Sequence, residues 1–193
     1  MARPKAFNPA DATRDAMQTF WEHGYHATSI DDLLSEMKLN RGSLYDTFGD
    51  KKQLFMAALA EYERLGNEML RETLCQPGSA RDAIIAMIQT ASDTCTGADG
   101  QKCCLALKAA MELAPHDADV LAWVRRVTKH REEVLAQVIE RGQNEKEINP
   151  KLEPRATARY LVTALAGLKM LGTTAPRKQE VNEVAKLILA ILD

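Results

Sequence analysis

The chain has 193 residues, which is enough for one good hydrophobic core or two small ones. Hydrophobic residues make up 46% of it and charged residues 27%, a balance typical of globular proteins and not of disordered ones. A formal net charge of −2 gives no general attraction to nucleic acid or to an anionic membrane, so any DNA binding must depend on local placement of charge. No segment offers the run of about 18 uncharged apolar residues that a membrane helix needs. We therefore expect a cytoplasmic protein with no membrane segment.

Composition also argues against metal, cofactor and catalytic sites. The four cysteines form no CxxC pair, and in a reducing compartment we expect thiols and not disulfides. Neither His116 nor His130 is spaced from the cysteines as metal ligands are, so no metal is predicted. No motif pairs a nucleophile with a base, and no glycine-rich loop suits a phosphate. The sequence therefore predicts neither an enzyme nor a bound cofactor.

Helix signals run along the whole chain and strand signals are nearly absent, which predicts an all-α fold. The first helix should follow Asn8 as its N-cap, with Pro9 at the first helical position. Gly24 is expected to end this helix. A second, short helix should begin at Thr28 or Ser29, since either side chain can cap it.

The run LNRGSLYDTFGDKKQLF, residues 39–55, predicts a third short helix from Arg41 to about Phe48 with Asn40 as its cap. Asp50 should then cap a fourth, longer helix. Two short helices joined by about four residues and braced by a first helix have the proportions of a helix-turn-helix. In such a unit the N-terminal end of the third helix enters the DNA major groove, which makes this run the candidate DNA reader.

The residue types at that end of the third helix suit DNA contact. Arg41 could bond the O6 and N7 atoms of a guanine, and Ser43 could serve a base or a phosphate. Gly42 would let the backbone approach closely. Tyr45 and Lys51 fit phosphate contacts that fix the register.

An ordinary solvated helix face is the alternative interpretation of these residues. Arginine, serine and lysine are common on such faces, and generic helix-turn-helix patterns occur often by chance. Residues 1–52 also carry slightly more acidic than basic side chains. A helical adaptor that binds only protein therefore stays open on this evidence.

The run FWEHGYHATSIDDLLSEMKLNRGSLYDTFGDKKQLFMAAL, residues 20–59, resembles the DNA-binding domain of TetR/AcrR-type transcriptional regulators. One position departs from the family pattern: the chain has Lys38 in the turn where the family commonly has glycine. A left-handed backbone at this position would cost a non-glycine residue about 1 kcal/mol. The positions that carry the resemblance are Phe20, Gly24, Tyr25, Thr28, Gly42, Ser43, Leu44, Tyr45, Phe48 and Lys51.

The resemblance implies roles for individual residues. Thr28, Tyr45 and Lys51 would hold phosphates, while Arg41 and Ser43 would lie nearest the bases. An N-terminal arm could enter the adjacent minor groove. The basic residues of that arm are Arg3 and Lys5. Each has a plainer alternative, since Thr28 could be only a cap, Tyr45 could pack, and Lys5 could be a solubilising terminus.

The resemblance also implies two domains, with residues 1–52 binding DNA and residues 53–193 forming a helical effector-binding and dimerisation domain. The final two helices of each subunit would build a four-helix dimer interface, so that two recognition helices reach the half-sites of a palindromic operator about 34 Å apart. Apolar helices buried within one chain would look similar in sequence. The candidate interface residues are Leu161, Leu168, Val181, Val184, Ile188 and Ile191.

Two kinds of signal are compatible with the second domain. Cys103 and Cys104 open a predicted helix, and Lys108 follows one turn later, so a thiolate there could sense oxidants or electrophiles. These cysteines could equally be small packing residues. The other signal is an apolar effector in a pocket, although plain core would show the same pattern. The candidate pocket residues are Met87, Met111, Trp123 and Leu165.

Together these features predict a homodimeric DNA-binding transcriptional regulator. We expect it to repress transcription by binding a palindromic double-stranded operator. A small apolar or electrophilic effector would release it from that DNA. A cysteine-based sensor on the same scaffold and a protein-binding adaptor without DNA binding are the alternatives.

Overall fold

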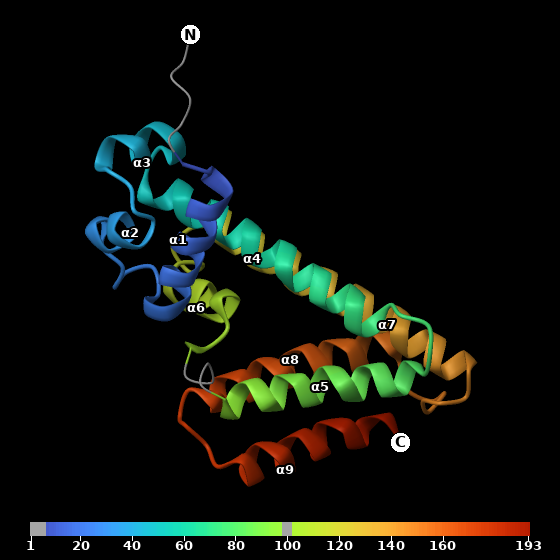
Figure 1. Cartoon of the computed structure of the whole chain (residues 1–193). Coiled ribbons are helices and arrows are strands. Elements are labelled where there is room, and N and C mark those ends of the chain that lie inside the picture. Colours follow the sequence, from blue (N-terminus) through green and yellow to red (C-terminus); the bar gives the residue numbers. More distant parts are fainter. Residues whose placement is uncertain (1–6, 98–101) are drawn as a thin grey trace. The chain divides into compact units, whose positions relative to one another are not determined.

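The computed structural model describes residues 7–97 and 102–193, and this part of the chain is helical and contains no β-strand (Figure 1). The all-α fold predicted from the sequence is confirmed. None of the described helices combines the length and apolar character that a bilayer crossing requires. The helices are α1 (Pro9–His23), α2 (Ile30–Glu36), α3 (Arg41–Phe48), α4 (Lys51–Leu74), α5 (Ala80–Thr96), α6 (Leu105–Glu112), α7 (Ala118–Asn144), α8 (Pro154–Gly172), α9 (Lys178–Leu189) and the 3-10 helix η2 (Ala190–Leu192).

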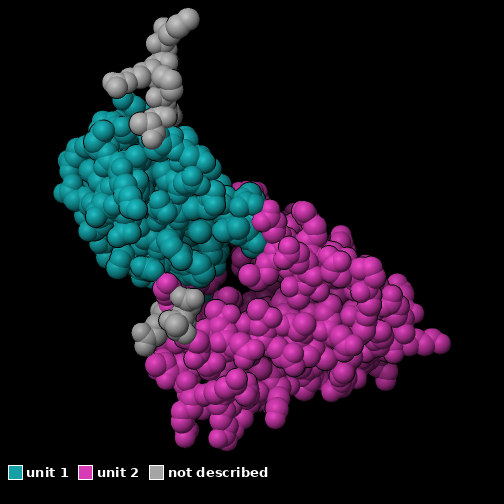
Figure 2. Space-filling view, in the orientation of Figure 1, with its two compact units in different colours: residues 1–66, 105–121 teal, residues 67–104, 122–193 magenta. Residues whose placement is uncertain are grey.

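Two compact units make up the chain (Figure 2). Unit 1 comprises residues 1–66 and 105–121, and unit 2 comprises residues 67–104 and 122–193. The division differs from the predicted boundary after residue 52. Residues 51–66 of α4 belong to unit 1 because buried side chains of this stretch complete the core beneath α1, where the rings of Phe20 and Phe55 meet edge to face at 4.9 Å. Helix α6 joins unit 1 through its packing on α1.

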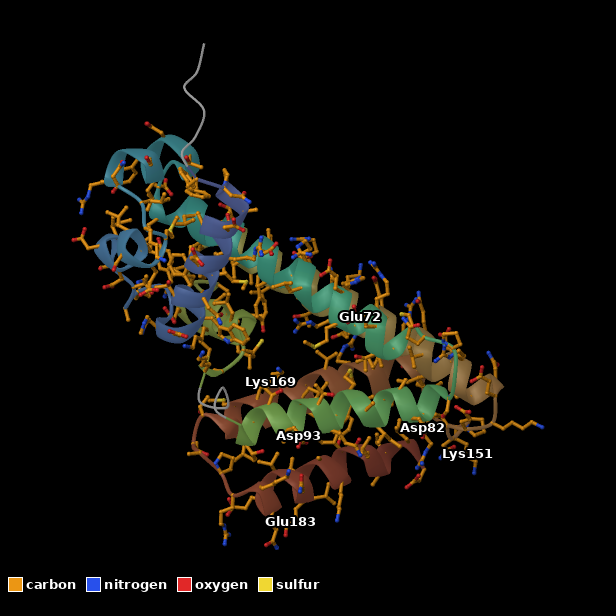
Figure 3. The ribbon with its side chains drawn as sticks, in the orientation of Figure 1. Glu72, Asp82, Asp93, Lys151, Lys169 and Glu183 are labelled. Carbon is orange, nitrogen blue, oxygen red and sulfur yellow. The ribbon has the colours of Figure 1, made fainter. Side chains whose placement is uncertain are left out.

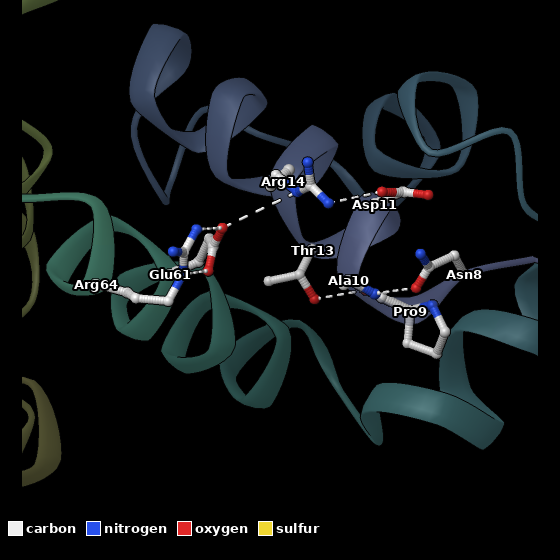
Figure 4. Close-up of polar contacts among 8 residues, drawn as sticks. All are labelled: Asn8, Pro9, Ala10, Asp11, Thr13, Arg14, Glu61 and Arg64. Carbon is white, nitrogen blue, oxygen red and sulfur yellow. Dashed lines mark hydrogen bonds and ion pairs between the residues drawn. The ribbon is translucent and has the colours of Figure 1, made fainter. Parts of the chain in front are cut away.

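Helix α1 begins and ends as predicted. The Asn8 side chain accepts a hydrogen bond from the backbone amide two residues on, at 3.0 Å, and Pro9 occupies the first helical position (Figure 4). Gly24 closes the helix with a left-handed φ of 84°. Arg14 connects α1 to α4, since its Nε atom lies 4.0 Å from Glu61. That carboxylate also accepts two 2.8 Å bonds from Arg64 one turn on, which fixes its position.

Side-chain caps define the short helices of the helix-turn-helix. Ser29, and not Thr28, caps α2, and it forms a reciprocal capping box with Asp32. Asn40 caps α3, and its side chain accepts a hydrogen bond from the amide of Ser43, the third residue of the helix, at 2.8 Å. Asp50 caps α4 in the same way at 2.7 Å. The caps predicted at positions 40 and 50 are therefore confirmed.

Unit 2 is built around α5, which packs against both α8 and α9. Charged side chains such as Asp93 on α5 and Glu183 on α9 stay exposed (Figure 3). The larger core cluster contains Leu74, Ala80, Ile84, Ile88, Leu135, Ala136, Val138, Ile139, Ile148, Ala158, Leu161, Ala185, Ile188 and Leu192.

The turn between α2 and α3 keeps a left-handed residue although glycine is absent. Lys38 has a φ of 52°, so the backbone keeps its left-handed conformation although the residue is not glycine. Because L side chains disfavour this region, the turn stores strain of about 1 kcal/mol.

Replacing Lys38 by glycine should therefore stabilise the protein by about 1 kcal/mol. Urea unfolding followed by circular dichroism measures the change. Lys38→Ala is the matched control, because it removes the charge and keeps the Cβ atom that causes the strain. Equal stabilities for the two variants would contradict this account of the turn.

Candidate DNA interface and regulatory surfaces

Helix α3 has one buried and one exposed side. Leu44 is fully buried and holds the helix against the rest of unit 1. Arg41 and Gly42 are exposed, Ser43 is half-buried, and the ring of Tyr45 is 41% exposed. The first five residues of α3 thus include the four that are expected to face DNA, and all four are at least partly accessible. Their individual contacts with bases or phosphates stay predictions.

The guanidinium of Arg41 forms an ion pair with an acid of the preceding helix. Its Nη2 atom lies 2.6 Å from Oδ1 of Asp31, in the first turn of α2. The two side chains are 58% and 78% exposed, so the pair lies on the outer surface of the helix-turn-helix. Sequence reasoning missed Asp31. The signal that could have found it is an acid in the first turn of α2 preceding a cation in the first turn of α3.

Gly42 is not required by the fold. A Cβ atom built at this position would have the side-chain oxygen of Asn40 as its nearest neighbour, at the ordinary contact distance of 3.4 Å. Its backbone is also free of the left-handed conformation found at Gly24 and Gly49. The described part of unit 1 therefore does not call for glycine at this position, and a close approach of DNA to Gly42 stays a prediction.

Thr28 is placed differently from the expectation that it holds a phosphate. Its side chain is only 1% exposed, and its hydroxyl donates a 2.6 Å hydrogen bond to the carbonyl of Gly24. The hydroxyl satisfies a carbonyl at the end of α1 and faces the interior. This side chain is therefore a structural element of the turn between α1 and α2.

Lys51 also has an intramolecular role. Its Nζ atom lies 4.4 Å from the centre of the Tyr25 ring, a cation–π contact at the edge of the aromatic core of unit 1. Burial lowers the pKa of Lys51, while the nearby carboxylates of Glu112 and Asp32 oppose that shift. A phosphate contact by Lys51 stays a prediction. Two other expected contacts, Arg3 and Lys5, lie outside the described residues.

Helix α6 supplies polar groups to the C-terminal end of α1. The Nζ atom of Lys108, a residue expected to act on the cysteines, donates to the carbonyls of Trp21 and Glu22 at 2.7 and 2.8 Å. A cation at a helix C-terminus is favoured by the helix dipole. At the other end of α6, a carboxylate oxygen of Glu112 accepts the backbone N–H of His26 at 3.0 Å. No local sequence signal could reveal these pairs, since 86 residues or more separate the partners.

A further ion pair within unit 1 joins α4 to the start of α7. Lys52 forms a charge-assisted hydrogen bond with Asp117, whose other carboxylate oxygen accepts the amides of Asp119 and Val120. The bond to Lys52 is the largest cause of the lowered pKa of Asp117. Asp117 therefore caps α7 and holds it to α4 at the same time.

The cysteines next to α6 lie in different environments. All four cysteines fall within the described residues, and none forms a disulfide. Cys104 is 5% exposed, whereas Cys103 is half-buried and has a left-handed φ of 29°. On α5, the buried Cys95 donates a hydrogen bond from Sγ to the carbonyl of Leu168 at 3.3 Å. Burial raises the pKa of Cys95, the neighbouring Lys169 on α8 (Figure 3) lowers it, and Cys103 acts in the raising direction.

The four residues expected to line an apolar pocket differ in burial and in the unit to which they belong. Met87 and Leu165 pack against the core cluster of unit 2. Trp123 is only 3% exposed. Met111 belongs to α6 in unit 1 and is 59% exposed. Plain core accounts for Met87 and Leu165, and the structure does not describe a pocket formed by the four.

Most of the expected dimer-interface residues lie inside the chain's own core. Leu161, Leu168, Val181 and Ile188 are at most 4% exposed, because α8 and α9 turn them toward α5. They are therefore core residues and not interface residues. Val184 is 36% exposed, and Ile191 is half-buried. The more exposed apolar residues of these two helices, which sequence reasoning missed, are Tyr160, Met170 and Leu187.

Comparison with protein families gives two matches that together span most of the chain. Residues 13–58 match the model described as bacterial regulatory proteins, tetR family. Residues 78–188 match the model described as tetracyclin repressor-like, C-terminal domain.

Individual proteins give consistent results. The chain is 30% identical to the uncharacterized HTH-type transcriptional regulator YezE of Bacillus subtilis, with 100% of each chain covered. It is 25% identical to the HTH-type transcriptional repressor ComR of Escherichia coli, over 98% of this chain and 90% of ComR. A structure of a cysteine mutant of the TetR family regulator CifR with 26-bp operator DNA is similar, with a TM-score of 0.87 and 25% identity over 99% of this chain and 100% of CifR.

The accessible glycine of α3 gives a test in which stability and DNA affinity move in opposite directions. Gly42→Ala should stabilise the protein by about 0.5 kcal/mol, because alanine loses less backbone entropy in a helix. The added methyl group should weaken binding to operator DNA roughly tenfold, or about 1.4 kcal/mol. Thermal unfolding and fluorescence anisotropy measure the two effects. Unchanged affinity in a stabilised variant would exclude a close DNA approach at this position.

Proposed function

Because the chain belongs to the tetR family of bacterial regulatory proteins and is a DNA-binding transcriptional regulator, we propose that it acts as a homodimeric repressor of a palindromic operator. The observation that carries the proposal is the exposed N-terminal part of α3, where Arg41, Gly42 and Tyr45 are each exposed. Arg41 would read a guanine, while Tyr45 and Lys51 would contact phosphates. Repression itself is supported by the similarity to ComR, which is named as a repressor.

The two proposed roles predict different effects on DNA binding. Arg41→Ala should reduce the preference for operator over scrambled DNA, because the residue contacts a base. Lys51→Ala should weaken binding to both DNAs alike and reduce the slope of log affinity against log salt by about 1. Fluorescence anisotropy at several salt concentrations, with the operator taken from DNA upstream of its own gene, measures both. Identical effects of the two substitutions would contradict the assignment.

The dimer interface would use the outward faces of α8 and α9. On α8, Tyr160, Gly167 and Met170 are exposed at helical spacing, and a Cβ atom built at Gly167 would meet no atom within 4 Å. On α9, Val184 and Leu187 are exposed at the same kind of spacing, and Leu187 is 73% exposed. Exposed apolar side chains on two neighbouring helices are typical of a subunit interface. The exposed glycine of α8 would let a partner helix approach closely in a four-helix dimer interface.

Leu187→Glu should dissociate the proposed dimer and weaken operator binding at least about tenfold, since a carboxylate would be buried without a partner. Sedimentation equilibrium and anisotropy with operator DNA measure the two effects. Asn182→Glu is the control, because this exposed position on α9 lies away from the proposed face. A Leu187→Glu variant that stays dimeric would exclude this face as the interface.

Modification of a cysteine thiol would cause the protein to release its operator DNA. Cys103 is half-buried, lies two residues before α6, and acts to raise the pKa of the buried Cys95. The CifR structure is that of a cysteine mutant bound to operator DNA, which supports a role for cysteines in a protein of similar fold. We therefore favour an electrophile or oxidant over an apolar ligand as the effector.

The thiol assignment is tested by adding a mild electrophile to the complex of protein and operator. Cys103→Ser should prevent electrophile-induced release, shifting the half-maximal concentration by roughly tenfold or more. Cys75→Ser is the control, because Cys75 is exposed and would react without a role in release. Release that persists in Cys103→Ser would rule out this thiol as the sensor.

A further inference from the structure

We propose that Asp31 is a positioning residue that sets base specificity by holding the guanidinium of Arg41 for guanine. The inference rests on the proposed base-reading role of Arg41 and adds a second residue to it. Asp31 would touch no base itself. It would act through the 2.6 Å contact between its Oδ1 atom and Nη2 of Arg41.

The position of Arg41 calls for a nearby anion. Arg41 is the first residue of α3, where the helix dipole is positive and a cation is unfavourable. The first turn of α3 contains no acidic residue that could compensate. Asp31, in the first turn of α2, supplies the missing negative charge from the neighbouring helix. The ion pair therefore connects the N-terminal ends of both helices of the helix-turn-helix.

The geometry of the pair leaves donors for DNA. An arginine has five N–H donors in a planar fork, and a bidentate contact with guanine uses two nitrogen atoms. The bond to Asp31 uses Nη2, and each Nη atom has two hydrogens, so Arg41 can keep this bond while other donors face a base. A phosphate that approaches the same guanidinium would meet the charge of the carboxylate. Asp31 thus favours the uncharged guanine edge over the backbone as the partner of Arg41.

Exposure makes the pair suitable for a test on DNA binding. An exposed ion pair contributes little to folding stability. Asp31 also takes no part in the cap of α2, which Ser29 and Asp32 form between them. Asp31→Asn should therefore lower the thermal unfolding midpoint only slightly, by the loss of an exposed charge at two helix N-termini, and a change in DNA choice beyond that of a matched control reports on recognition.

The experiment compares affinities for operator and scrambled DNA by fluorescence anisotropy for the wild type, Asp31→Asn, Asp31→Glu and Arg41→Ala. Asp31→Asn should lower the operator-to-scrambled affinity ratio roughly tenfold, within the range of one bidentate base contact. Asp31→Glu, which keeps the charge, should restore part of that ratio. Asp46→Asn is the matched control, since it removes one exposed acid from α3 itself and should raise both affinities alike.

A double variant and a modified base separate the possible outcomes. If Asp31 acts through Arg41, then Asp31→Asn in the Arg41→Ala background should cause no further loss of the ratio. Replacing the operator guanines one at a time by 7-deazaguanine should identify a guanine whose N7 atom matters to the wild type and no longer to either single variant. An Asp31→Asn ratio equal to that of Asp46→Asn, or additive losses in the double variant, would overturn the proposal. A wild-type protein without operator preference would instead refute the proposed function.

Discussion

The position of α3 depends on the packing of one buried side chain and on caps at both helix ends. The helix has eight residues, whereas isolated helices shorter than about 12–15 residues are only marginally stable in water. Leu44 is fully buried, Asn40 caps the start of the helix, and the amide of Gly49 donates to the carbonyl of Tyr45 at its end. The contacts that keep α3 helical therefore also fix the position of Arg41 at its start.

The same principle extends to the turn between α1 and α2, on which the recognition helix is braced. The C-terminal carbonyls of α1 are satisfied by Lys108, and the carbonyl of Gly24 is satisfied by Thr28. A Cβ atom at Gly24 would lie 2.2 Å from a carboxylate oxygen of Glu112, which is the flexible end of a side chain and can shift, so the left-handed φ of 84° is what favours glycine here. Polar groups contributed by α6 thus complete the helix-turn-helix of unit 1.

Local features were predictable from the sequence, and contacts between distant residues were not. The caps at Asn8, Asn40 and Asp50 followed from short-range rules and are present. Periodicity found the apolar residues of α8 and α9 but could not show which of two apolar faces points inward. Leu161 is therefore core, while Leu187 is exposed. The roles of Lys108 and Asp31 needed the fold, because each depends on a partner in another helix.

The covalent position of Cys103 gives the thiol proposal a physical route. Cys103 lies two residues before α6, and Lys108 lies within the first turns of that helix. Hydrogen bonds to charged groups contribute about 1.5–3 kcal/mol each, and Lys108 makes two of them to α1. Allosteric couplings are typically about 1–3 kcal/mol. Displacing the start of α6 far enough to lose one of these bonds would therefore suffice to change the stability of the α1 end that braces the recognition helix.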